Sequence, residues 1–318
     1  MQSPILFNEG SLRSFEEELF LMHDPNTTDV ARLQDIIDVK YNAADLNAVV
    51  KDIKTINKHQ KKQLHVLLTK YKELFDGGLG SWKTDPIKLE LKDPNCKPYH
   101  AKPYPVPVSQ EKKLKAEIKR FVDWGILRKV NRSEWAMPAF TIPKSDGSLR
   151  SLADSRELNK RIKRMPYPLP KIQEILRRLN GLRWATALDL NMGYYHLVLD
   201  PASSRLCTVV FPWGKYEYTR LPMGLCNSPD IFQEKMNDLM QGLEFAKAYI
   251  DDLLITSDQT FEQHLEHLEK VLTRLRDAGL KVNLTKSKLC QTELEYLGYW
   301  ITRQGIQPLT KRLKQYLL

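Results

Sequence analysis

Two adjacent aspartates, Asp251 and Asp252, stand between two apolar runs in the stretch AYIDDLLITS, residues 248–257. Short apolar runs bounded by turn residues are typical of buried strands. A carboxylate pair is excluded from the interior unless it is partnered, because an unpaired buried charge is costly. The stretch therefore predicts a hairpin, and the plainest interpretation is a tight turn in which aspartate is a favoured residue.

A third aspartate, Asp189, interrupts the alternating apolar pattern of ATALDL, residues 185–190. A lone charge in a strand fit for burial is unfavourable unless it is paired or binds a cation. If this strand packs beside the hairpin, three carboxylates converge at one edge of a sheet. Such oxygen ligands suit Mg²⁺, and two metal ions there can activate an attacking hydroxyl and neutralise a leaving pyrophosphate.

The charge of the chain favours a polyanionic partner. Its 318 residues include 49 Lys and Arg against 39 Asp and Glu, a net charge of +10. Residues 1–60 hold 6 basic and 10 acidic side chains, so the positive excess lies downstream. A basic surface of this kind suits a nucleic-acid backbone, although many basic proteins bind nothing anionic.

Several other classes of protein are not supported. The four cysteines are far apart, which favours reduced, buried thiols over zinc ligands or a disulfide framework. No Gly-rich phosphate loop follows a strand, so the Rossmann and Walker classes have no support. No 18-residue apolar run or secretory signal is present, so no membrane segment is expected. His264 and His267 are surrounded by Glu and Lys, which predicts a solvated helix face rather than a metal site.

Helices are expected where apolar residues recur at three- and four-residue steps. These segments are residues 14–75, 109–125 and 260–280. A proline-started helix closed by Gly181 is expected at 166–181, and another is expected from Ser228, its N-cap.

Strands are expected between these helices. A strand and a proline-rich connector are predicted at 86–107, and a hairpin around the turn Ser145-Asp146-Gly147. The remaining predicted strands are ATALDL, HLVLDP and the hairpin CTVVFPWGKYEYTRL.

Eight motifs follow one another over roughly residues 63–308 in an order that resembles reverse transcriptases, specifically the gypsy type of LTR retrotransposon polymerase. Eight motifs in order are far more specific than any one of them. They are AFTIPKSDGSLR, DSRELN, YPLP, ALDLNMGYYHLVL, FPWGKYEYTRLPMGLCNSPDIFQ, YIDD, AGLKVNLTKS and YLGYWITRQGI.

The resemblance implies an α+β right-hand polymerase fold with fingers and palm, in which helices back an antiparallel palm sheet. The thumb is expected to be missing or only begun. The implied domains are an acidic helical N-terminal extension at 1–62, an approach segment and fingers at 63–164, a palm at 165–308 with a fingers insertion at about 197–226, and a stub towards the thumb at 309–318.

By the same resemblance, Asp189, Asp251 and Asp252 are the catalytic carboxylates. The first two are expected to bind the metal directly, with Asp252 supporting them. The implied cofactor is a pair of Mg²⁺ ions, with Mn²⁺ as an alternative.

Five further residues match the family's nucleotide site. Tyr194 matches the aromatic gate that excludes a ribose 2′-hydroxyl by steric clash. Lys144 and Arg150 match residues that grip the triphosphate, where an Arg fork suits phosphate oxygens. Met223 matches the loop that lines the pocket, and Lys286 matches the candidate general acid for pyrophosphate.

Three residues match the template and primer side of the family. Gln233 is expected to face the template. Tyr296 and Gly298 belong to the hairpin that holds the primer end, where glycine allows close backbone approach. An ordinary strand and turn is the alternative for this hairpin.

The implied function is RNA-directed DNA polymerase within a retrotransposon Pol polyprotein. The expected partners are an RNA or DNA template with its primer and deoxynucleoside triphosphates. The expected location is intracellular, in the cytoplasm or the nucleus. The alternative is a catalytically inactive, nucleic-acid-binding remnant, because the chain ends where the thumb should begin and Ser155 replaces the family's usual Phe or Tyr. Loss of that buried ring costs about 3–5 kcal/mol if nothing repacks.

Overall fold

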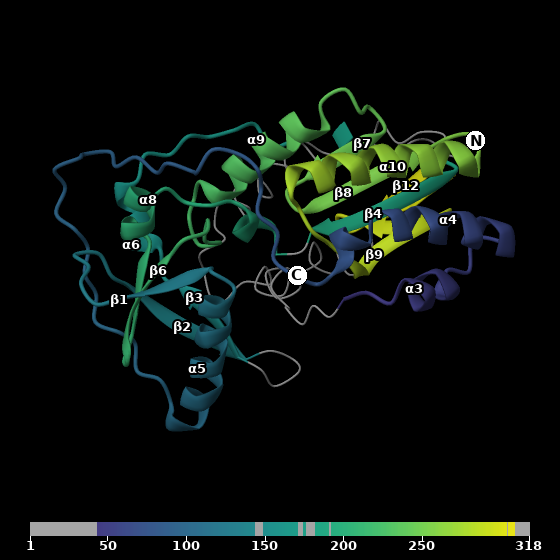
Figure 1. Ribbon diagram of the computed structural model, residues 1–318. Helices are drawn as coiled ribbons and strands as arrows, with labels where there is room; N and C mark the ends of the chain where they lie inside the picture. The colour runs from purple at the N-terminus through teal and green to yellow at the C-terminus, as the bar shows by residue number, and fades with distance from the viewer. Residues whose placement is uncertain are drawn as a thin grey trace.

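A computed structural model describes residues 43–143, 149–170, 174–175, 182–190, 192–303 and 305–308. Figure 1 shows two sheets well apart, one at the left with β1, β2, β3 and β6, and one at the right with β4, β7, β8 and β9. Helices pack on both.

The right-hand sheet is antiparallel, in the order β7-β8-β4-β9. Its two central strands, β8 and β4, have a neighbouring strand on each side and are mostly buried, as the apolar patterns of their sequences predict. The four strands are β7 (Ala246–Tyr249), β8 (Asp252–Ser257), β4 (Trp184–Leu190) and β9 (Val282–Gln291).

Two long helices pack against this sheet. Helix α9 (Ser228–Met240) contacts β7, and α10 (Phe261–Ala278) crosses β8 and β4. α10, expected at 260–280, is capped by Thr260 and closed by Gly279. The cap of α9 is Asn227 rather than the expected Ser228, because the Ser228 hydroxyl donates to the Pro222 carbonyl instead.

The helices expected before residue 75 are confirmed from residue 46 onward, as α3 (Leu46–Asp52), α4 (Lys58–Lys70) and the 3₁₀ turn η1 (Lys72–Phe75). Leu64 and Leu68 of α4 are fully buried, and α4 contacts α10. The helices predicted before residue 43 lie outside the described residues.

The left-hand sheet has five strands in the order β1-β6-β5-β2-β3. Only the β2–β5 pair is parallel. The strands are β1 (Leu127–Val130), β6 (Gly214–Tyr218), β5 (Thr208–Phe211), β2 (Met137–Pro143) and β3 (Leu149–Ala153). Helix α5 (Val108–Asp123) contacts β3 and β1 and buries the apolar stripe Leu114, Ile118 and Phe121 predicted for it. The pairing of β2 with β3 and of β5 with β6 confirms the strands of both hairpins predicted for this region, while the turn Ser145-Asp146-Gly147 lies outside the described residues.

Two predicted strands are wrong. Each of these segments, residues 86–91 and HLVLDP, pairs with its neighbours at single residues only, so it forms isolated bridges. Examples are Ile87 with Leu199 and Val198 with Arg220. Short helical segments flank these connections: α6 (Arg156–Arg161), η2 (Gly193–His196) and α8 (Pro201–Leu206). The helix predicted at 166–181 lies mostly outside the described residues.

A third sheet of three short antiparallel strands ends the described chain. It consists of β10 (Leu294–Tyr296), β11 (Tyr299–Thr302) and β12 (Gly305–Pro308). Leu294 and Ile301 pack in one core cluster with Leu254 of β8, which attaches this sheet to the larger one.

Candidate active site

Three aspartates meet where β4 ends and β8 begins. Asp189 is the direct cross-strand partner of Asp252. Asp251 precedes Asp252 in the turn of the β7–β8 hairpin, and its carbonyl accepts a 3.2 Å hydrogen bond from the Leu190 amide. Directly opposed residues in an antiparallel pair are neighbours on the same face. The structure therefore brings the Asp189 strand beside the hairpin, at the end of the two central strands.

The turn that carries Asp251 is strained, and Gln233 holds it. Ile250 has a φ of 55°, a left-handed conformation that is unfavourable for a β-branched residue. The Gln233 amide oxygen accepts from the Ile250 N–H at 2.7 Å, and its Nε2 donates to the Ala248 carbonyl at 3.1 Å. Gln233 is fully buried on α9, so its side chain acts on the hairpin backbone in the described structure.

The electrostatics of the site oppose ionisation of the aspartates. Burial raises the pKa of Asp189 to about 7, with Asp252 adding to the effect and Lys286 opposing it. Burial, then the charges of Asp252 and Asp189, also raise the pKa of Asp251 well above its usual range. These like charges are held together although their mutual repulsion disfavours it.

The donor chemistry of the three aspartates fits a divalent cation. Hard carboxylate oxygens are the ligands that Mg²⁺ prefers, and a cation would relieve the repulsion that raises both pKa values. Within the described residues, however, no three His, Cys, Asp or Glu side chains are close enough to hold a metal as they stand. The aspartates thus offer the right ligands without a preformed cage.

Tyr194 lies next to the aspartates on the 3₁₀ turn η2, which begins three residues after β4. Its ring makes an edge contact with Phe232 of α9, with 5.4 Å between the ring centroids. Burial and the Asp251 charge raise the pKa of its phenol well above the usual value. Gly193 packs so closely that an added Cβ would lie 3.4 Å from the Asp251 Cβ. Tyr194 therefore borders the site and stays protonated.

The β10–β11 hairpin contacts the backbone of Asp252 through the side chain of Tyr296. The Tyr296 hydroxyl donates to the Asp252 carbonyl at 3.3 Å, and the phenol is buried. Leu297 and Gly298, with φ of 49° and 78°, form the turn. Tyr296 thus anchors the hairpin to β8, and Gly298 lies at its tip.

A model of the family described as reverse transcriptase (RNA-dependent DNA polymerase) matches residues 142–301, half of the chain, and this span contains all three aspartates. The chain belongs to the reverse transcriptase family.

Its relatives are Pol polyproteins of retrotransposons and retroviruses. The chain is 31% identical over 267 residues to that of transposon 297 of Drosophila melanogaster, covering 81% of this chain and 25% of the relative. It is 33% identical over 266 residues to the Pro-Pol polyprotein of Simian foamy virus type 1, covering 82% and 22%. The chain thus spans about a quarter of the length of these relatives.

Solved foamy viral protease-reverse transcriptases share the fold. A complex with double-stranded DNA matches with a TM-score of 0.77 and 26% identity, over 90% of this chain and 48% of that one. A complex with an RNA/DNA hybrid matches with a TM-score of 0.76 and 26% identity, over 90% and 37%. The chain therefore has the α+β right-hand polymerase fold that the resemblance implied.

The structure describes only some of the residues expected to bind the triphosphate or to line the nucleotide pocket. Lys144 lies outside the described residues, and Arg150 lies on β3 opposite Ile142. Met223 packs partly buried against the core, next to Gly224, whose carbonyl accepts from Asn159 at 3.0 Å.

Ser155 packs closely against the loop at Gly224. Ser155 is buried, and a Cβ added to Gly224 would lie 2.7 Å from its hydroxyl oxygen. The close approach of the Gly224 backbone leaves little room for a larger side chain on that side of Ser155. The Ser155 hydroxyl has no hydrogen-bond partner among the described residues.

Two functional neighbours of Asp189 carry no sequence signal that would have identified them. The Ser287 hydroxyl accepts the Asp189 N–H at 3.1 Å and donates to the Asn283 carbonyl at 2.7 Å. Asn283 is the cross-strand partner of Asp189 on β9. Both residues lie in the polar stretch NLTKSK. Only the pairing of β9 with β4 shows which polar residues of this stretch lie beside Asp189.

The expected solvated histidine face is also wrong in part. His264 is fully buried and contacts Thr186 and Ser257 through its two ring nitrogens, at 2.8 and 3.0 Å. His267 shares Ser257 with it at 2.9 Å. The small polar partners on β4 and β8 make burial tolerable.

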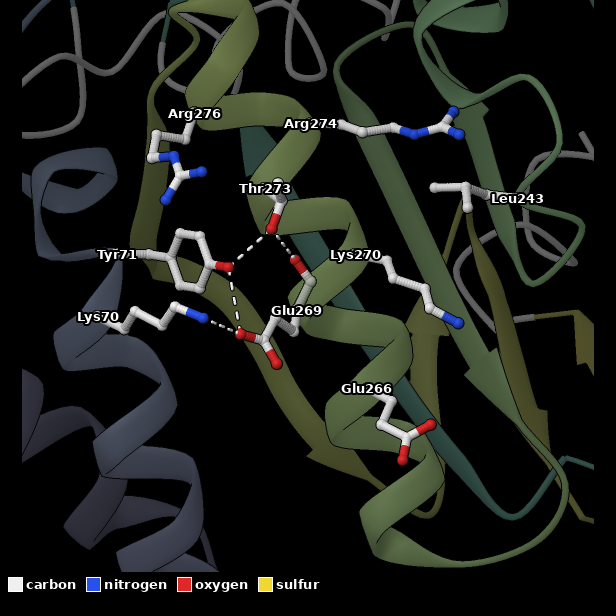
Figure 2. Close-up of a pocket in the computed structure, with 9 residues that line it drawn as sticks. All are labelled: Lys70, Tyr71, Leu243, Glu266, Glu269, Lys270, Thr273, Arg274 and Arg276. Atoms are coloured by element: carbon white, nitrogen blue, oxygen red, sulfur yellow. Dashed lines mark hydrogen bonds and ion pairs between the residues drawn. The ribbon is translucent and has the colours of Figure 1, made fainter.

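A separate hollow of about 680 Å³ lies between α4 and α10. Figure 2 shows Tyr71 bonded to Thr273 and Glu269, and Lys70 paired with Glu269. None of the residues that line it belongs to the candidate active site.

No helix in the described ranges is long and apolar enough to cross a membrane.

Proposed function

We propose that the chain is the RNA-directed DNA polymerase part of a Pol polyprotein of the gypsy type of LTR retrotransposon. The observation that carries the proposal is the pairing of Asp189 with Asp252 beside Asp251, within the span that matches the reverse transcriptase family. The proposed reaction adds a deoxynucleotide to a primer 3′-hydroxyl on an RNA or DNA template and releases pyrophosphate.

Asp189 and Asp251 are the proposed metal ligands, with Asp252 supporting them. Two Mg²⁺ ions, or Mn²⁺ in their place, would supply activation of the primer hydroxyl and neutralisation of pyrophosphate. The chain's own contribution is to hold the three carboxylates together against their repulsion. Lys286, close enough to Asp189 to lower its pKa, is the proposed proton donor for pyrophosphate.

Substrate binding is assigned by position around the aspartates. Tyr194 is the proposed sugar gate, Met223 a wall of the nucleotide pocket, and Lys144 and Arg150 the triphosphate grip. The hairpin of Tyr296 and Gly298 is proposed to hold the primer end.

Gln233 is proposed to serve the template side indirectly, because it is buried and bonds to the hairpin backbone. The domain bounds given above, 1–62, 63–164, 165–308 and 309–318, are part of the same proposal.

Primer extension on an RNA template with Mg²⁺ tests the function. We expect the chain to extend the primer, and we expect Asp251→Asn and chelation by EDTA each to reduce extension by at least about a hundredfold, the scale of lost transition-state electrostatics. Asp258→Asn is the matched control, since Asp258 is an exposed aspartate six residues after Asp252. Extension that survives Asp251→Asn would overturn the metal role. Binding of template and primer without any extension would instead favour the inactive remnant.

A further inference from the structure

His196 is a fully buried histidine held by both ring nitrogens. Nδ1 lies 2.9 Å from the Gly193 carbonyl oxygen, and the Lys281 backbone N–H lies 3.1 Å from Nε2. A carbonyl can only accept and a backbone amide can only donate, so the proton is on Nδ1 and the ring is neutral. Burial agrees with this, because it lowers the pKa of His196 to about 4.

Three segments that are far apart in the sequence close around this ring. Its own turn, η2, follows β4, and Lys281 immediately precedes β9. The third segment passes at Gly80, where an added Cβ would lie 2.5 Å from the His196 Cδ2. The Trp82 N–H also donates to the His196 carbonyl at 2.9 Å. The ring therefore has one position available to it.

The two hydrogen bonds of His196 reach both sides of the active site. Gly193, which accepts from Nδ1, packs against Asp251 and immediately precedes Tyr194. Lys281, which donates to Nε2, immediately precedes the strand β9, whose Val282 pairs with Leu190, next to Asp189. His196 thus links the turn that carries Tyr194 to the strand beside the catalytic one.

We propose that His196 is a positioning residue for sugar selection, which fixes η2 so that the Tyr194 ring keeps its place beside the aspartates. The proposal rests on the proposed polymerase function. His196 does not touch the reacting atoms, and it acts through Tyr194. A small displacement of an excluding ring admits a 2′-hydroxyl, because steric exclusion depends on contact distance.

Two substitutions of His196 each remove one of its two hydrogen bonds and can keep the other. In His196→Asn the side-chain amide can still donate to the Gly193 carbonyl. In His196→Gln the longer amide can still accept from the Lys281 N–H but leaves Gly193 free. The matched control is His264→Gln, because His264 is equally buried and bonded through both ring nitrogens.

The decisive measurement is the ratio of kcat/KM for a deoxynucleotide to that for the matching ribonucleotide. We expect His196→Gln to lower this ratio roughly tenfold, the scale of one lost buried hydrogen bond, and His196→Asn to restore most of it. His264→Gln should lower Tm without changing the ratio. In a Tyr194→Val background, His196→Gln should change the ratio no further, because the two residues act in series.

The proposal would be overturned if His196→Gln left the ratio unchanged and lowered Tm as His264→Gln does. His196 would then only stabilise the core. If the wild-type chain adds no nucleotide, the polymerase proposal fails and amide hydrogen exchange tests the positioning role instead. The Tyr195 and Leu197 amides, which donate to Met192 and Tyr194, should then exchange at least about tenfold faster in His196→Gln, but not in His264→Gln. Equal exchange in the two variants would overturn it.

Discussion

The buried carboxylates where β4 ends and β8 begins make the folded chain less stable than it would be without their charges. Asp251 is buried, and burial with its two carboxylate neighbours raises its pKa. A carboxyl group whose pKa rises on folding holds its proton more tightly in the folded chain. The free energy of unfolding therefore falls as the pH rises past the ordinary carboxyl range. Such a cost is typical of functional sites, where charge is kept for chemistry.

The first prediction follows for Asp251→Asn without divalent cations. At pH 8 the variant should unfold with a free energy higher than that of the wild type by on the order of 1 kcal/mol. The gain should shrink as the pH falls to about 4 and below, where the carboxyl becomes protonated in the unfolded chain as well. Urea unfolding at the two pH values measures it, with Asp258→Asn as the exposed control. A variant less stable than the wild type at pH 8 would show that the carboxylate is stabilised by contacts rather than penalised.

At the scale of elements, the β7–β8 hairpin depends on a helix from outside the sheet. Gln233 of α9 satisfies two backbone groups of this turn, the N–H of the strained Ile250 and the carbonyl of Ala248. Without these bonds the buried turn leaves an unpaired N–H, and the left-handed residue loses its support.

The second prediction is that Gln233→Met, close in size but unable to form either bond, lowers the free energy of unfolding by about 1–3 kcal/mol. It should also lower primer extension more than stability alone requires, because Asp251 follows the turn directly. Met236→Leu, a change at another fully buried position of α9, is the control for packing. Full extension by Gln233→Met at a temperature where it remains folded would contradict the role.

How far the elements could be predicted depends on where their partners lie. The alternation of ATALDL and the apolar runs beside Asp251 are enough to predict β4 and the β7–β8 hairpin, because the pattern and the turn are local. HLVLDP shows a similar pattern yet forms only bridges, since its partners are single residues elsewhere in the chain. Burial of Gln233 and His264 has no local signature at all. It arises when α9 and α10 pack on the sheet, so the carboxylates could be found from the sequence and their supports could not.

At the scale of the whole molecule, folding buries His196 and His264 in the neutral form, two histidines of the described residues. Burial lowers the pKa of His196 to about 4 and, with the nearby His267, that of His264 to about 3. The unfolded chain takes up protons at its histidines below about pH 6.5, whereas these two stay neutral in the folded chain. At these two side chains the unfolded state therefore binds more protons below that pH, so their contribution to stability falls as the pH is lowered.

The third prediction isolates one of these histidines. Between pH 7 and pH 5 the wild type should lose about 2 kcal/mol more of its free energy of unfolding than His264→Gln does, the share of a single histidine protonated only when unfolded. Glutamine does not titrate and can still bond to Thr186 or Ser257, so the variant keeps a partner in the buried site. Urea unfolding at the two pH values gives the difference, and Asp258→Asn should behave like the wild type. Equal losses in the wild type and His264→Gln would contradict the prediction, because they would mean that His264 titrates alike in the unfolded chain and in its buried site against β4 and β8.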